Sequence, residues 1–139
     1  MAGGLSKESL SKLGTVTEAP DRLIVDVDAS GIKSAVKSLL DMCPDLHITS
    51  IVGVDRGEEI ELQYHFFCIP ERRLVTLRTK VPKAKAEVES ISELIYGAIL
   101  HENEVEELLG VVFKGNPRSG KRLLLPEGWP KGVYPLRKS

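Results

Sequence analysis

The stretch EIELQYHFFCI, residues 59–69, shows the clearest periodicity in the chain. Apolar and polar side chains alternate along it, which is typical of a β-strand with one buried and one solvated face. The apolar positions of the predicted buried face are Ile60, Leu62, Tyr64, Phe66 and Cys68. We therefore expect a half-buried strand here, and the fold is predicted outward from it.

Strand patterns flank this stretch on both sides. DLHITSIVGV (45–54) precedes it, and the turn DRGE (55–58) between them contains Gly57, which is free to adopt positive φ. LVTLRTKV (74–81) follows after the turn PERR (70–73). The sequence thus predicts a meander of three antiparallel strands.

A strand and a helix precede the meander, and a second helix is predicted after it. RLIVDVDA (22–29) reads as a strand, and residues 32–43 carry apolar side chains at helical spacing up to Pro44. After Pro82, a second helix is expected to run to about Leu100, from the apolar positions Val88, Ile91, Ile95, Ala98 and Ile99. This order predicts an α+β two-layer sandwich, with both helices on one face of a four-stranded mixed sheet.

Composition excludes several classes of function. A length of 139 residues fits one domain, and a formal net charge of −1 gives no general attraction to nucleic acid or anionic membranes. No apolar run approaches the ~20 residues that cross a bilayer. The N-terminus has no apolar signal region, so we expect a cytoplasmic protein.

Cys43 and Cys68 are expected to be buried reduced thiols, and no metal site is predicted.

We divide the chain into a polar N-terminal arm (1–20), the α+β domain (21–110) and an extended C-terminal docking arm (111–139). The C-terminal arm is rich in Pro and Gly and carries seven basic residues against the single acid Glu127. It also holds the large apolar residues Leu123, Leu124, Leu125, Trp129, Val133, Tyr134 and Leu136, more than a solvated tail normally carries. The arm is therefore expected to fold back over its own sheet or to lie in a groove on a partner, and both alternatives stay open.

The arm begins with a near match to a nucleotide-binding loop. GNPRSGKR (115–122) satisfies seven of the eight positions of G-x-x-x-x-G-K-[ST], with Arg122 in place of Ser or Thr. A true phosphate loop opens a helix, but only a short segment separates Lys121 from Pro126. We therefore interpret the stretch as a Gly-Pro turn that leads into the arm.

Residues 101–139, HENEVEELLGVVFKGNPRSGKRLLLPEGWPKGVYPLRKS, resemble the C-terminal signature of the 30-kDa-type hydrophilic subunit of respiratory complex I. The stretch contains counterparts of several steps of this signature. These are the two acids of E-R-E, the later glycine, proline, basic-leucine and aromatic steps, and P-L-R-K. Asn103, Asn116, Tyr134 and Ser139 depart from the signature. With these departures, the chain resembles the relatives of that subunit in energy-converting membrane-bound hydrogenases and formate hydrogenlyases.

The resemblance implies a non-catalytic subunit that binds no cofactor and no metal. Such a subunit packs beside the hydrogenase-like large subunit, lies on the cytoplasmic side, and meets the membrane only through its complex, which carries electron transfer and ion translocation. The residues expected to contact the partner or to fix the arm are Glu102, Glu104, Gly115, Pro117, Arg122, Trp129, Tyr134, Pro135, Leu136, Arg137 and Lys138. As an internal alternative, Glu102 and Glu104 pair with Arg122 or Arg137.

Two other classes of function remain as alternatives at this point. The basic tail is compatible with a nucleic-acid or protein binding module unrelated to electron transfer, which requires its cations on one face beside exposed aromatic residues. A small enzyme using His101, Glu102 or Glu104 as acid or base requires a pocket that brings these groups together.

Overall fold

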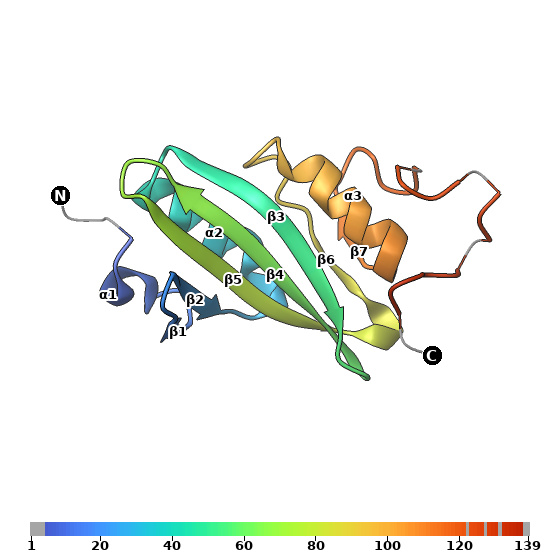
Figure 1. Cartoon of the computed structure of the whole chain (residues 1–139), viewed down its shortest axis with the longest axis horizontal. Coiled ribbons are helices and arrows are strands. Elements are labelled where there is room, and N and C mark those ends of the chain that lie inside the picture. Colours follow the sequence, from blue (N-terminus) through green and yellow to red (C-terminus); the bar gives the residue numbers. More distant parts are fainter. Residues whose placement is uncertain (1–4, 122, 127, 131, 138–139) are drawn as a thin grey trace.

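The structure is a computed structural model that describes residues 5–121, 123–126, 128–130 and 132–137. Its centre is a mixed sheet of five strands in the order β1-β2-β5-β4-β3 (Figure 1). β2 and β5 are parallel, and the other neighbouring pairs are antiparallel. The strands are β1 (Thr15–Glu18), β2 (Arg22–Asp26), β3 (Leu46–Asp55), β4 (Glu59–Cys68) and β5 (Arg73–Pro82).

The strand at the centre of the sequence prediction is confirmed. β4 lies between β3 and β5, and Tyr64 on its apolar face is level with Ile51 and Leu77 on the two neighbouring strands. All five apolar positions of that face are buried. Helix α2 (Ile32–Met42) lies behind the sheet in Figure 1 and directs its buried residues toward this core.

The prediction of four strands is wrong, because β1 adds a fifth strand at the edge of the sheet. β1 has the sequence TVTE and pairs with β2 through its backbone. Most of its side chains are exposed, so no burial pattern marks it in the sequence. The short helix α1 (Lys7–Leu10) precedes β1, and Leu5 and Leu10 are buried in the hydrophobic core. The segment predicted as a polar N-terminal arm thus contains both elements.

The prediction of a helix between Pro82 and Leu100 is also wrong. A short 3-10 helix η2 (Lys83–Lys85) and the strand β6 (Glu87–Glu89) follow β5, and the last helix α3 extends over Ala98–Leu109. Val88 and Ile91 are buried, but from a strand and the turn after it. Buried positions in such a segment imitate a helical spacing, which periodicity alone does not separate from a true helix.

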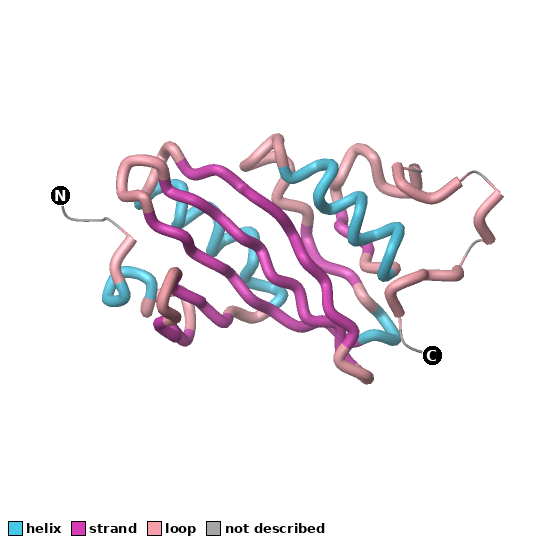
Figure 2. Tube along the Cα trace, viewed as in Figure 1, coloured by secondary structure: helices cyan, strands magenta, loops and turns pink. Residues whose placement is uncertain are grey.

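A second, smaller sheet lies near α3. β6 pairs in parallel with β7 (Val112–Lys114), which follows α3 directly. In Figure 2 the segment after β7 forms a loop that passes beside α3, extends away from it and returns near its end. Part of the segment predicted as the C-terminal arm therefore pairs with β6.

The expectation of two reduced thiols is wrong, because Cys43 and Cys68 form a disulfide with their Cα atoms 6.2 Å apart. Cys43 follows α2, and Cys68 ends β4 opposite Leu46, which brings the two side chains together. In the part of the chain that the structure describes, no helix is long and apolar enough to span a bilayer. No cluster of three potential metal ligands occurs among those residues either.

Candidate docking site: helix α3 and the C-terminal arm

Helix α3 packs closely against the edge strand β3. A Cβ atom at Gly53 would overlap Leu109 Cδ1 and lie 3.3 Å from Val105 Cγ1, so the glycine allows this close approach. The helix ends at Leu109 and is capped by Gly110, whose φ of 76° lies in the left-handed region that favours glycine. α3 is thereby fixed to the sheet on one side and leaves its other side for the arm.

The carboxylate of Glu102 lies at the centre of a buried polar cluster. It accepts hydrogen bonds from Ser90 Oγ at 2.6 Å, Ile91 N at 2.8 Å and Asn116 Nδ2 at 2.8 Å. Burial raises the pKa of Glu102 above its ordinary range, while the three hydrogen bonds act in the opposite direction. One side chain therefore joins the segment after β6, helix α3 and the turn after β7.

Asn103 and Asn116 fix the first turn of the arm. Asn103 Oδ1 accepts from Arg118 Nε at 3.1 Å, and its Nδ2 donates to the carbonyl oxygen of Lys121 at 3.1 Å. Asn116 Oδ1 accepts from the Arg118 backbone at 2.7 Å, and its Nδ2 also donates to the carbonyl oxygen of Ile99. The signature has other residue types at both asparagine positions, and here the two amides bind backbone groups and the side chains of Arg118 and Glu102.

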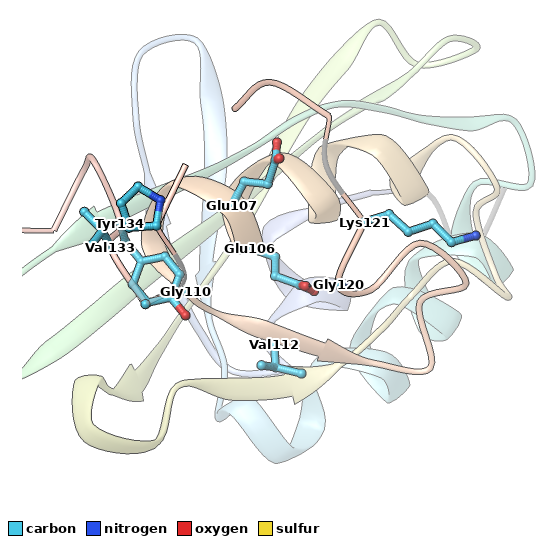
Figure 3. A pocket seen from close by; sticks show the side chains of 10 residues that line it. Glu106, Glu107, Gly110, Val112, Gly120, Lys121, Val133 and Tyr134 are labelled. Carbon is cyan, nitrogen blue, oxygen red and sulfur yellow. Dashed lines mark hydrogen bonds between the residues drawn. The ribbon is translucent and has the colours of Figure 1, made fainter. Parts of the chain in front are cut away.

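Two further carboxylates of α3 bind the backbone that follows. Glu106 accepts from Ser119 Oγ at 3.0 Å and Gly120 N at 2.7 Å. Glu107 accepts at 2.7 Å from the backbone N–H of Leu123 and at 2.6 Å from that of Leu124. In Figure 3 the Glu106 carboxylate reaches toward Gly120. Side chains at 102, 103, 106 and 107 share one helix face, so α3 presents a row of polar groups to the arm.

The arm meets α3 again at the end of the helix. Leu136 N donates to the carbonyl oxygen of Leu108 at 2.9 Å, and Arg137 Nε donates to that of Leu109 at 2.6 Å. The Tyr134 ring lies beside Gly110 in Figure 3, and the Arg137 guanidinium stands 4.9 Å from the ring centroid. These bonds satisfy carbonyl groups that the last turn of a helix leaves without internal partners.

A cleft of about 400 Å³ lies between α3 and the two attached parts of the arm. Its lining combines the acids Glu106 and Glu107 with the apolar residues Val112, Val133 and Tyr134. Figure 3 shows the Lys121 side chain pointing away from the two acids. The cleft is thus acidic along α3 and apolar along the arm.

The structure brings several predicted site residues to α3 and leaves others at the surface. Glu102 and Glu104 lie on the helix, and Tyr134, Leu136 and Arg137 lie at its end. Gly115, Pro117 and Pro135 are exposed, and half-buried Trp129 donates from Nε1 to the Val133 carbonyl oxygen at 2.7 Å. Arg122 and Lys138 lie outside the described residues.

The alternative of an internal ion pair is not what the structure shows for Arg137. Arg137 Nε is directed to the Leu109 carbonyl, and Glu102 is bound by Ser90, Ile91 and Asn116. Among the described residues, no ion pair joins Arg137 to Glu102 or Glu104. Among the described residues of the arm, Glu106 and Glu107 accept hydrogen bonds from backbone N–H groups and from Ser119 Oγ.

Sequence reasoning missed Asn103, Glu106, Glu107 and Asn116 as residues that hold the arm. The signal for the three on α3 is the spacing of its polar side chains, which together with Glu102 are separated by one, three and one positions and so share a face. That face precedes a Pro- and Gly-rich segment with many backbone donors. The combination indicates carboxylate-to-backbone contacts, but not which N–H groups are bound.

Fold and site together define a class of α+β protein that carries its C-terminal segment on its last helix. A family described as "Respiratory-chain NADH dehydrogenase, 30 Kd subunit" matches residues 25–139, and the chain belongs to this family. The resemblance inferred from residues 101–139 is thereby confirmed.

Relatives of the chain are subunits of complex I-like and hydrogenase-type membrane complexes. The chain is 31% identical to a subunit of the F(420)H(2) dehydrogenase of Methanosarcina mazei over 137 residues, 97% of this chain and 84% of that one. It is 27% identical to the beta subunit of the membrane-bound hydrogenase of Pyrococcus furiosus, over 84% of this chain and 69% of that one. A chain in the structure of an archaeal membrane-bound sulfane sulfur reductase shares the fold, with a TM-score of 0.82, 24% identity, and coverage of 94% and 80%.

Proposed function

We propose that the chain is a structural subunit of a membrane-associated oxidoreductase complex of the complex I-like or energy-converting hydrogenase type. It docks on the hydrogenase-like large subunit through the face of α3 and the C-terminal arm. Family membership supports the assignment to such a complex. The chemistry of electron transfer and ion translocation belongs to other subunits, and this chain contributes no catalytic group or cofactor of its own.

The exposed apolar side chains of the arm are the observation that carries this proposal. Leu124 is 55% exposed, Leu136 54% and Val133 48%, although the neighbouring backbone is fixed to α3 or to the end of that helix. Large apolar residues gathered on a short surface segment mark protein-protein contacts more often than solvated tails. In this proposal the arm is held on α3 by its backbone, and its exposed apolar side chains lie in a groove on the partner, which is the second alternative that the sequence left open.

The finer parts of the proposal concern individual residues and location. Trp129 is the first candidate for an anchor, because it lies on the loop between the two attachments of the arm to α3. Tyr134 and Arg137 fix the arm at the end of α3. The subunit lies on the cytoplasmic side and meets the membrane only through its complex. The division at residues 20 and 110 into arm, domain and docking arm is part of the same proposal.

Purification of the tagged chain from its own cells tests the proposal. Membranes are solubilised in a mild detergent, and the co-purifying chains are identified by mass spectrometry. We expect a hydrogenase-like large subunit in stoichiometric amount. A chain that leaves the column as a monomer, free of any such subunit, contradicts the proposal.

Matched variants then test the surface itself. Leu124→Asp is expected to abolish co-purification, because a charged group replaces an apolar side chain on the docking surface. Ile69→Asp is the control, since Ile69 is 47% exposed in the β4–β5 turn, on another part of the molecule (Figure 1). Equal loss of the partner in both variants argues against docking through the arm.

A further inference from the structure

Two adjacent acids of α3 accept hydrogen bonds from a short segment of the arm, several of them from its backbone N–H groups. Glu106 binds Ser119 and Gly120, and Glu107 binds Leu123 and Leu124. A third, longer bond of 3.4 Å joins Leu125 N to Glu107. Hydrogen bonds from backbone N–H groups to an ionised carboxylate are among the stronger ones in proteins.

The two carboxylates differ in burial, and both face the arm. Glu107 is only 6% exposed, so its charge depends on the arm for much of the solvation that water would otherwise supply. Glu106 is half-buried and lines the cleft. Both acids therefore contribute to the attachment of the arm to α3, and Glu107 does so from a buried position.

Backbone attachment leaves the leucine side chains available. The N–H groups of Leu123 and Leu124 point to Glu107, while their side chains are 38% and 55% exposed. Part of each side chain is therefore open to solvent, more so for Leu124 than for Leu123. A segment held in one conformation before it meets a partner loses less conformational entropy on binding than a mobile one.

We propose that Glu106 and Glu107 are positioning residues that hold residues 119–121 and 123–125 in a binding-ready conformation and present Leu123 and Leu124 to the partner subunit. The partner surface is an apolar hollow bordered by carboxylates. Apolar side chains fit the hollow, and the arm with its seven basic residues and one acid fits an acidic border. This inference rests on the proposed function, because it specifies how the same surface is prepared for docking.

Amide hydrogen exchange of the isolated chain tests the positioning. In Glu107→Gln, the amides of Leu123 and Leu124 are expected to exchange at least about tenfold faster, since a weaker, neutral acceptor replaces the carboxylate. Glu106→Gln is expected to affect Gly120 in the same way. Glu18→Gln removes one exposed carboxylate of β1, which pairs with Lys7, and serves as the control of equal charge change. Unchanged exchange at Leu123 and Leu124 overturns the proposal.

Assembly in cells tests the consequence for docking. Each tagged variant competes with the untagged wild-type chain, and its share of the purified complex is measured. We expect Glu107→Gln and Glu106→Gln to lower that share by about tenfold, and Glu18→Gln to leave it unchanged. A change at buried Glu107 can also disturb folding. Ser119→Ala therefore serves as a milder second variant, because it removes only one hydrogen bond of the arm, the bond to Glu106.

The outcomes separate this inference from the function on which it rests. Faster exchange with reduced assembly supports positioning. Faster exchange with an unchanged share in the complex overturns positioning and leaves the proposed function intact. Failure of the wild-type chain itself to enter any complex overturns the proposed function instead. Leu124→Asp is expected to block assembly with normal exchange at Gly120, which distinguishes contact from positioning.

Discussion

Arg137 Nε donates a 2.6 Å hydrogen bond to the carbonyl oxygen of Leu109, 28 residues earlier in the chain. Leu109 is the last residue of α3, so a cation of the arm lies at the negative end of the helix dipole. The Tyr134 ring beside the guanidinium adds a cation-π contact. The final part of the arm thus caps the C-terminal end of α3.

Arg137→Ala is expected to lower the free energy of unfolding by about 1–2 kcal/mol. The Leu109 carbonyl loses its hydrogen-bond donor, and the negative end of the helix dipole loses a nearby cation. Chemical denaturation of the isolated chain measures this. Lys114→Ala is the control, since Lys114 forms a surface ion pair with Glu87 and such pairs contribute about 0–1 kcal/mol. Equal losses in the two variants contradict a capping role for Arg137.

Gly110→Ala is expected to destabilise the fold by about 1–2 kcal/mol from the left-handed backbone alone. A clash adds to this, because the new Cβ would lie 2.5 Å from Tyr134 Cε2. Gly128→Ala is the matched control: Gly128 has no neighbouring atom within 4 Å of an added Cβ. The double change Gly110→Ala/Tyr134→Ala should cost less than the sum of the single changes, which a double-mutant cycle measures. Strict additivity shows that the ring does not press on Gly110.

The disulfide between Cys43 and Cys68 predicts a redox-dependent stability. The unfolded, unreduced chain is expected to take no thiol label, and the reduced chain two labels, by mass spectrometry. Reduction should lower the free energy of unfolding by about 3 kcal/mol, since the bond closes a loop with a sequence separation of 25 residues. Identical unfolding curves with and without reductant would show that the bond contributes nothing.

Glu102 predicts a dependence of stability on pH. Burial raises the pKa of its carboxyl in the folded state above the ordinary value of 4.5. The stability that this group contributes is therefore fully present below pH 4.5 and is lost as pH rises through the folded-state pKa. Glu102→Gln cannot titrate, so wild-type stability should decline relative to this variant as pH increases through that range. Parallel pH profiles of the two proteins, measured by denaturation, contradict the raised pKa.

The sequence predicted the parts of the fold in which burial follows a simple period. Alternation identified β4, and helical spacing up to Pro44 identified α2. β1 escaped because its side chains are mostly exposed and only its backbone joins the sheet. The segment after Pro82 was misassigned because Val88 and Ile91 are buried without a helix between them. A disulfide depends on two Cα atoms that only the packed fold brings within reach.

Prediction of the site was limited in a similar way. The signature indicated Glu102 and the P-L-R-K step, and the structure brings Glu102, Leu136 and Arg137 to the same helix. Glu106 and Glu107 were not predicted, because backbone N–H groups are among their partners and every sequence contains such groups. Side-chain identity cannot reveal an acceptor whose donors belong to the main chain.

The dependence of α3 on the arm has a consequence during translation. Residues 116–137 leave the ribosome after α3, and until then Glu107 and the carbonyl groups of Leu108 and Leu109 lack the donors described above. A nascent chain that has reached only Gly110 therefore contains all residues of α3 but not the hydrogen bonds that the arm donates to it. The end of α3 receives these hydrogen bonds only after the arm has been synthesised. A truncated product that lacks the arm is therefore expected to be degraded by proteases and not to enter the complex.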